Sequence, residues 1–398
     1  MVLGLASMMS CSAVSSGNSG NTSNTTKTGG GSSSSTAVAS QYLYTANSGT
    51  ISGFAINSDG TLSPLANFPV TTAVPAASLS VAKSSLLTGG CDANANCGIS
   101  LYSIASQSGN LTPSSSTPMA GSGSVALDPS AISAYATGGT QANPNGTVAG
   151  FSTSGNFSPL PGSPYLFSIG GGSNPVTAGP IVVDPSGKFL YMGSVTPQNE
   201  HTPAGSLGMA LRNAEGSLSG FSTTRGCITA GSVAVAPEQG TSLVYATCVD
   251  DWSGMYWIAS MIVDQTAGTT STNGAAFVSP GPNQLLLGLA ADPSGKWLAV
   301  TDLNNNSVHI MSINPATGAL SDSPDHIFPT GTAPNAATFD RTGKFLYVTN
   351  GGYRFSGATG SNNISAFAFN AATGMLTPLP GSPYAVGQAP TAIAIAQP

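Results

Sequence analysis

Short apolar runs alternate with turn residues along most of the chain. The clearest run is FLYVTN at 345–350, in which an aromatic residue opens a strand-like stretch. It is one of seven copies that follow one another 43 to 56 residues apart, the other six lying at 42–47, 85–90, 133–138, 189–194, 243–248 and 297–302. A repeat of about 50 residues is typical of solenoids, propellers and arrays.

Each repeat holds four strand-like runs with turn residues between them. The turns of the last repeat are Asp-Arg-Thr-Gly at 340–343 and Ala-Ala-Thr-Gly at 371–374, where Gly supplies the positive φ of a tight turn. The four runs of this repeat lie at 335–340, 345–350, 363–369 and 375–381. Four antiparallel strands repeated seven times predict an all-β fold, a seven-bladed β-propeller.

The two ends of the repeat region predict how the ring closes. The repeats begin with a run typical of a second strand of a blade, YLYTAN at 42–47, and end with TAIAIAQP at 391–398, which is similar to a first strand. We therefore expect the C-terminal strand to complete the first blade and to seal the ring, so that only short, protected edges remain. The sequence thus predicts one propeller domain over 38–398.

Several recurring pieces resemble the lactonase-like propeller family, which includes enzymes of the 6-phosphogluconolactonase and carboxymuconate cyclase types. The pieces are FLYVTN, DPSGKFLY at 184–191, GMLTPLPGSPY at 374–384 and SPLPGSPY at 158–165. The resemblance covers 38–398 and implies the propeller fold. Enzymes of this group often carry an Arg-His pair before an inner strand, and the corresponding stretches at 178–184, 286–292 and 333–340 lack it. Gly351, rather than an acidic residue, follows FLYVTN.

The first 37 residues differ from the repeats. Residues 2–9 form an apolar run that is far shorter than the roughly 20 residues needed to span a bilayer. With Ser10 and Cys11 this run, at 1–11, resembles a bacterial lipobox, which predicts acylation of Cys11; an ordinary cleaved signal or a disordered N-terminus are the alternatives. Residues 12–37 are dominated by Ser, Gly, Asn and Thr and are predicted to be a flexible tether. We expect a cell-envelope or secreted protein that meets the membrane only through its lipid.

Four cysteines remain beyond Cys11. Cys91 and Cys97 bracket one short loop, and Cys227 and Cys248 are expected at the same end of another blade. Two disulfides, Cys91 with Cys97 and Cys227 with Cys248, suit a chain outside the cytoplasm. Reduced, buried thiols in a cytosolic protein are the alternative.

Charge is scarce in this chain and leans acidic. Charged residues make up 6%, against a usual share of about 25%. Lys and Arg total 9 and Asp and Glu 15, for a net charge of −6, which argues against binding nucleic acid. Three histidines without a spacing pattern argue against structural zinc, His309 is predicted to be a packing residue, and we expect no cofactor.

Blade topology sorts the charged residues by face. With the strands of a blade lettered a to d from the channel outward, the a–b and c–d turns share one face, the turn face. The b–c loops and the d-to-a connections share the other, the loop face. The turn-face charges are expected to be solvated turn residues, and they are Asp59, Lys83, Asp128, Asp184, Lys188, Arg212, Glu215, Glu238, Asp264, Asp292, Lys296, Asp340, Arg341 and Lys344.

The loop face is the predicted site, because its long, irregular loops break the repeat. Candidate catalytic residues there are Glu200, His201, Arg225 and Arg354. Candidate ligand-contacting residues are Asp250, Asp251, Trp252, Tyr256, Asp302 and Tyr353. Together with Asp92, Asp322, Asp325 and His326, this face carries seven acids against two arginines, which disfavours a dianionic phosphosugar and favours a neutral ligand, a cation or a basic protein surface.

Two main functions follow, and a third stays open. The first is an extracytoplasmic, monomeric propeller that binds a small neutral sugar or lactone, or a cell-surface protein, at the loop-face mouth of the channel without lactonase activity. The alternative is a lactone hydrolase of the 6-phosphogluconolactonase type acting on an uncharged sugar lactone. There Glu200 and His201 would act as base and partner, and Arg225 or Arg354 would hold the oxyanion. The third is a structural surface protein without a small ligand.

Overall fold

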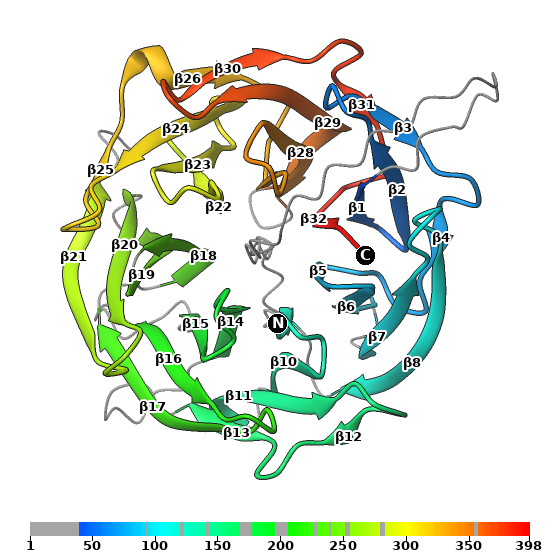
Figure 1. The fold of residues 1–398 in the computed structure, drawn as a ribbon, viewed down its shortest axis with the longest axis vertical. Coiled ribbons are helices and arrows are strands. Elements are labelled where there is room, and N and C mark those ends of the chain that lie inside the picture. Colours follow the sequence, from blue (N-terminus) through cyan, green and yellow to red (C-terminus); the bar gives the residue numbers. More distant parts are fainter. Residues whose placement is uncertain are drawn as a thin grey trace, which may run out of the picture.

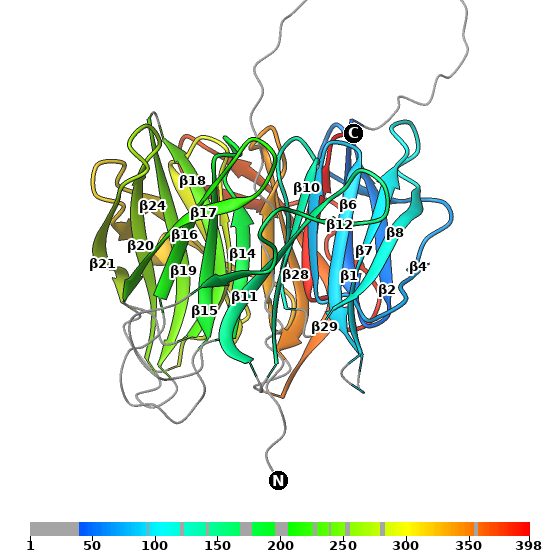
Figure 2. The same cartoon turned by 90° about the horizontal axis from the view of Figure 1, so that it is seen from below.

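A computed structural model shows a ring of seven β-sheet blades around a central axis (Figure 1). It describes residues 40–92, 94, 96–119, 123–140, 143–167, 177–195, 206–225, 229–238, 240–250, 255–278, 283–353 and 357–398. Figure 2 shows the ring from the side, with the strands running between its two faces. Within these residues, one 3₁₀ turn, η1 (Pro324–His326), is the sole helical element, and no helix is long and apolar enough to cross a bilayer. The predicted all-β, seven-bladed propeller is confirmed.

Blades 1 to 3 follow the predicted pattern of antiparallel neighbours, named here from a to d. Blade 1 comprises β32 (Ala392–Ala396), β1 (Gln41–Asn47), β2 (Thr50–Ile56) and the two outer pieces β3 (Leu62–Pro64) and β4 (Val70–Thr71). Blade 2 comprises β5 (Ser78–Ala82), β6 (Ser85–Cys91), β7 (Cys97–Ile104) and β8 (Leu111–Met119). Blade 3 comprises β9 (Val125–Leu127), β10 (Ser133–Thr140), β11 (Asn143–Ser152), β12 (Ser158–Pro159) and β13 (Tyr165–Phe167).

Blades 4 to 7 repeat the arrangement. Blade 4 comprises β14 (Thr177–Val183), β15 (Phe189–Val195), β16 (Ser206–Arg212) and β17 (Leu218–Arg225). Blade 5 comprises β18 (Thr229–Glu238), β19 (Thr241–Asp250), β20 (Met255–Asp264) and β21 (Thr270–Val278). Blade 6 comprises β22 (Leu286–Ala291), β23 (Trp297–Asp302), β24 (Ser307–Ile313), β25 (Leu320–Ser321) and β26 (Ile327–Pro329). Blade 7 comprises β27 (Ala336–Phe339), β28 (Phe345–Tyr353), β29 (Ala358–Asn370), β30 (Met375–Pro378) and β31 (Tyr384–Ala385).

The ring closes as predicted, through the strand at the C-terminal end. β32 pairs antiparallel with β1, with Leu43 opposite Ile395 and Tyr44 opposite Ala394. All five residues of β32 are buried. Figure 1 shows the C-terminus beside this pair, at the inner side of blade 1.

The core lies between adjacent blades rather than inside any one of them. Side chains alternate along a strand, so each b strand supplies both of its faces to the core. Leu43 packs with Tyr347 of blade 7, whereas the next residue, Tyr44, packs with Leu79 of blade 2. This two-sided burial explains why the b strands are nearly continuous apolar runs in the sequence.

Two expectations about charged residues are wrong. Asp128, Asp184, Asp292 and Asp340 were expected to be solvated, but each is at most 1% exposed, and each carboxylate accepts N–H groups of its own turn. Asp322, Asp325 and His326 were placed on the loop face. They lie instead within the outer edge of blade 6, because its outer strand is split into β25 and β26 with η1 between them.

Candidate functional site

The a–b turn of blade 7 is held rigid by the carboxylate of Asp340. Its Oδ1 accepts the backbone N–H groups of Lys344, at 2.7 Å, and Phe345, at 2.8 Å. Its Oδ2 accepts the N–H of Thr342 at 2.9 Å and the hydroxyl of the same residue at 2.5 Å. Asp is favoured in such turns because its short side chain reaches backbone donors a few residues ahead.

The next blade in the ring also donates to this turn. The Nε2 of Gln41, at the start of β1, donates to Oδ2 of Asp340 over 3.2 Å, and its Oε1 accepts the N–H of Arg341 at 3.0 Å. The five donors around Asp340 use the lone pairs of both oxygens, so this buried carboxylate has no capacity left to act as a base.

Tyrosine hydroxyls and turn glycines tie the same neighbours together. The Tyr347 hydroxyl donates to the carbonyl of Gly60 at 2.7 Å, and the Tyr44 hydroxyl donates to the carbonyl of Gly109 at 2.6 Å. Both glycines have positive φ, and a Cβ on Gly60 would overlap the ring of Phe345. In blades 1 and 2 the c–d turn therefore lies directly over an aromatic ring of the preceding blade, Phe345 and Tyr42 respectively.

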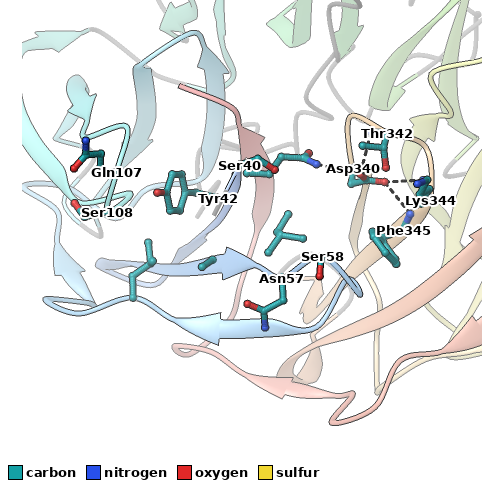
Figure 3. A pocket seen from close by; sticks show the side chains of 14 residues that line it. Ser40, Tyr42, Asn57, Ser58, Gln107, Ser108, Asp340, Thr342, Lys344 and Phe345 are labelled. Atoms are coloured by element: carbon teal, nitrogen blue, oxygen red, sulfur yellow. Dashed lines mark hydrogen bonds between the residues drawn. The ribbon is translucent and has the colours of Figure 1, made fainter. Parts of the chain in front are cut away.

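A pocket of about 520 Å³ opens between these turns, on the turn face (Figure 3). We call it the closure pocket. Its volume lies within the roughly 300 to 1,000 Å³ usual for small-molecule sites. It is lined by Ser40, Gln41, Tyr42, Ala55, Ile56, Asn57, Ser58, Leu65, Gln107, Ser108, Asp340, Thr342, Lys344 and Phe345, which come from blades 7, 1 and 2.

The pocket lies at the blade whose two inner strands come from opposite ends of the described chain. In blade 7 the a and b strands are joined by the Asp340 turn, whereas in blade 1 the corresponding strands, β32 and β1, are not consecutive. Among the described residues, no a–b turn covers this part of blade 1, and Gln41 stands where a turn lysine, Lys344, stands in blade 7.

The lining combines an apolar floor with a neutral polar rim. Tyr42 and Ile56 are buried and Phe345 is half-buried, whereas the side chains of Asn57 and Gln107 are exposed. The Tyr42 hydroxyl donates to the carbonyl of Ser106 at 3.0 Å, and burial raises the Tyr42 pKa above its ordinary value. The pocket lining contains neither a free carboxylate nor an ionised phenol. It can therefore bind a ligand through hydrogen bonds and ring contacts, but it has no group suited to proton transfer.

The predicted loop-face site is described only in part. Glu200, His201, Asp251, Trp252 and Arg354 lie outside the described residues, as do Cys11 and Cys227. The backbones of Arg225, Asp250, Tyr256, Asp302 and Tyr353 all lie at loop-face strand ends, where Asp250 pairs with Met255 and Tyr353 with Ala358. Tyr256 is half-buried among apolar side chains of blades 5 and 6.

Asp302 belongs to a buried polar cluster that the sequence reasoning missed. Its side chain is 0% exposed, and its Oδ2 lies 3.7 Å from Nε2 of His309, which is itself 2% exposed. The Nδ1 of His309 lies 2.8 Å from Oδ2 of Asp322. His309 was expected to be a packing residue. A comparison of repeats would have pointed to it, since His309 stands where blades 1 and 7 have Ser52 and Ser365.

The cluster has the residue types of a Ser-His-Asp triad but not its chemistry. Ser307 Oγ lies 3.5 Å from Nε2 of His309 and the residue is only 5% exposed, so a substrate has no access to it. Asp302 faces the same nitrogen and favours a proton there, which leaves no lone pair to take the serine proton. Elsewhere in the described residues, no three His, Cys, Asp or Glu side chains form a group that could hold a metal ion.

The Cys91–Cys97 disulfide is confirmed, and it joins directly paired residues of β6 and β7. Cys248 is also disulfide-bonded and is fully buried. Its predicted partner, Cys227, lies outside the described residues, so that pairing stays a prediction.

Comparison with known proteins matches the fold. Residues 289–395 match the family model described as lactonase, 7-bladed beta-propeller. A periplasmic gluconolactonase from Pseudomonas aeruginosa is similar in structure, with a TM-score of 0.65, 16% identity and coverage of 90% of this chain and 100% of that one. A Bacteroides uniformis protein, provisionally assigned as a 6-phosphogluconolactonase, gives a TM-score of 0.67 at 16% identity, covering 89% and 99% of the two chains. A search of curated protein sequences found no match.

The chain folds as a seven-bladed propeller, and its residues 289–395 are similar to the lactonase family.

One departure of this chain from the lactonase-like enzyme group has a physical reason. The residue after FLYVTN is Gly351, and a Cβ at this position would overlap the backbone carbonyl of Pro390. An acidic side chain cannot be placed at Gly351 without moving the connection that leads into β32, the inner strand of the next blade.

Proposed function

We propose that this lactonase-like propeller binds a small, neutral, polar ligand of the sugar or sugar-lactone class in the closure pocket. The observation that carries the proposal is the composition of that pocket, in which an apolar floor with two aromatic rings lies beneath neutral hydroxyl and amide groups. Sugars combine apolar ring faces with hydroxyls that both donate and accept, and this lining matches both.

The charges of the pocket support a neutral ligand. Its two charged side chains are Asp340, which is buried and fully hydrogen-bonded, and Lys344, which is exposed. They cancel in formal charge. A single solvated ammonium group gives little attraction for an anion, whereas the five neutral polar side chains of the rim select by hydrogen-bond geometry; they are Ser40, Asn57, Ser58, Gln107 and Ser108.

Filling the pocket tests the proposal. Gln107 lies in a c–d turn, and the equivalent turn of blade 7 has Ala372, which is exposed and outside the pocket. Gln107→Trp should weaken the binding of neutral sugars and lactones at least tenfold in calorimetric titration, and the matched control Ala372→Trp should leave it unchanged. Equal losses in both variants, or no binding of a broad panel by the unaltered protein, would overturn the proposal.

Lactone hydrolysis is the second candidate, favoured by the family match and by the gluconolactonase name of the Pseudomonas neighbour. A pH-stat assay with uncharged sugar lactones tests it. Turnover that disappears in Glu200→Ala or Arg354→Ala would place the reaction at the loop-face mouth. Turnover that disappears only in Gln107→Trp would place it in the closure pocket.

We further propose that the protein resides in the cell envelope and is lipid-anchored at Cys11. The Cys91–Cys97 disulfide supports an oxidising compartment. Metabolic labelling with a fatty acid should mark the unaltered protein and not Cys11→Ala. Equal labelling of both would contradict the anchor.

A further inference from the structure

One position near the loop-face end of the b strand has the same role in three blades. In blade 1, Asn47 donates through Nδ2 to the hydroxyl of Ser52 at 3.0 Å. In blade 7, Asn350 donates through Nδ2 to the hydroxyl of Ser365, also at 3.0 Å. Both asparagines are 0% exposed, so these two neutral pairs tie strand b to strand c beside the loop face.

Blade 6 carries a charged version of this pair. Asp302 occupies the position of Asn47 and Asn350, and His309 occupies the position of the serines. A carboxylate and an imidazole replace an amide and a hydroxyl, at the same depth. Of the three ties, this one alone changes its charge with pH.

The histidine also holds the outer edge of the blade. Asp322 follows β25, and its carboxylate is the 2.8 Å partner of His309 Nδ1. Strand β24 pairs with β25 at Ile313, opposite Leu320, and with β26 at His309, opposite Ile327. The stretch between β25 and β26 pairs with no strand of its own blade. His309 is therefore one side chain that fastens this stretch to the inner strands, through the carboxylate of Asp322.

Asp302 in turn anchors the loop face. It accepts the backbone N–H of Leu285 at 3.2 Å and the Nδ2 group of Asn305 at 2.7 Å. Leu285 packs with Leu303 and Ala333 in a small apolar cluster under the loops of blade 6. One ionic cluster thus connects the b–c loop, the entry into the inner strand and the outer edge.

We propose that the Asp302–His309–Asp322 cluster is a pH-dependent latch, which holds the loops and outer edge of blade 6 while His309 is protonated and releases them when it loses its proton. The cluster then contains two carboxylates without a cation between them, one of them fully buried. The two like charges on either side of the imidazole then repel each other, and a buried charge without a partner is strongly destabilising.

The direction of the pH effect follows from the two pKa shifts. Burial lowers the pKa of His309, but hydrogen bonds and charge from Asp302 and Asp322 outweigh it and raise the pKa to about 9. The His309 contribution to stability is therefore complete below about pH 6.5, the unfolded value, and is lost as the pH rises through about 9. Burial raises the pKa of Asp302, but its partners, His309 first, lower it overall, so the Asp302 contribution is lost only in acid.

Other titratable groups around the cluster are few. On the outer edge, Asp325 is exposed, and the ring of His326 lies edge-on to Trp297 with centroids 5.5 Å apart. From blade 5, the Tyr256 phenol packs into the apolar layer beside β24. His326 provides a matched control, being a histidine of the same blade outside the cluster.

Hydrogen exchange at a series of pH values tests the latch. After correction for the intrinsic rate, exchange in peptides covering 303–330 should rise at least tenfold between pH 7.5 and 10, while peptides covering 363–385 of blade 7 should not change. The double variant Asp302→Asn with His309→Ser, which copies the blade 7 pair, should fold and lose this step. The control variant His326→Gln should keep the pH-dependent rise in exchange.

A direct titration distinguishes a latch from general alkaline unfolding. The imidazole resonance of His309, assigned by its loss in His309→Gln, should titrate above pH 8 while the blade 7 peptides stay protected. Titration near pH 6.5, or an exchange step that persists in the double variant, would overturn the proposal. Neither result depends on ligand binding at the closure pocket.

Discussion

Two junctions between neighbouring blades share one design but differ in charge. Where blade 3 meets blade 4, Arg212 Nη2 lies 3.3 Å from the buried carboxylate of the Asp128 turn, and Arg212 also donates to the hydroxyls of Tyr135 and Ser133. Where blade 7 meets blade 1, the neutral amide of Gln41 reaches the Asp340 turn. The long, cationic side chain of Arg212 fills the first junction, whereas the closure pocket lies open beside Gln41 at the second.

The difference shows how this ring divides its stabilising contacts. At the junction of blades 3 and 4, where the chain runs on from one blade to the next, the Arg212 side chain covers the turn face. At the closing blade, the pairing of β32 with β1 holds the ring, and the side-chain contact can be weaker. Space for a ligand is therefore available at the closing blade at little cost in stability.

Removing the cationic side chain of Arg212 should cause the largest loss in the free energy of unfolding. Arg212→Ala leaves the 1%-exposed Asp128 without its charge partner, so we expect unfolding to become easier by about 3–5 kcal/mol. Urea denaturation measures the loss. A loss below about 1 kcal/mol would mean that the two junctions do not differ as their charges imply.

Added bulk at the junction between blades 7 and 1 should cause the second-largest loss of stability. Gly60 has φ +84° and lies against the ring of Phe345, so Gly60→Ala should cost about 3 kcal/mol, as left-handed strain and overpacking add. Gly155, in the equivalent turn of blade 3, has φ +79° with no atom within 4 Å of an added Cβ. Gly155→Ala should therefore cost only the strain, about 1–2 kcal/mol. Equal losses in the two variants would show that the ring contact is unimportant.

The neutral contact should be worth less than the ionic one. Gln41→Ala removes two hydrogen bonds but leaves the four donors of the Asp340 turn in place, so we expect a loss of about 1–2 kcal/mol in the free energy of unfolding. A loss as large as that of Arg212→Ala would erase the distinction between the junctions.

The smallest effect concerns a single hydroxyl. Tyr347→Phe removes a buried bond between blades 7 and 1 and should cost about 1 kcal/mol. The exposed Tyr384 hydroxyl bonds to Pro380 within its own blade, and Tyr384→Phe should stay within about 0.5 kcal/mol of the unaltered protein. Thermal denaturation of both variants makes the comparison, and the reverse order would contradict it.

The repeat pattern was enough to predict the blades. All seven predicted b strands begin within two residues of the observed ones, because their apolar runs are buried on both faces and bounded by turn residues. Ring closure was also predictable, since β32 has the pattern of an a strand without a blade of its own.

Burial of polar groups was not predictable from the same pattern. Asp340 and Asp59 both occupy turns, yet Asp340 is fully buried and Asp59 is exposed, because only the first is covered by a residue of the next blade. The closure pocket was missed for a related reason. It lies where blade 1 lacks an a–b turn between its inner strands, and a missing turn leaves no motif in the repeat pattern.

The pairing of β32 with β1 also governs how the molecule can be made. Strand β1 is among the first parts of the propeller to leave the ribosome, but its inner neighbour is among the last. While the other six blades are being synthesised, one edge of β1 has no partner and is open to wrong pairing. A chaperone that shields an apolar strand edge during translation would therefore act mainly on blade 1.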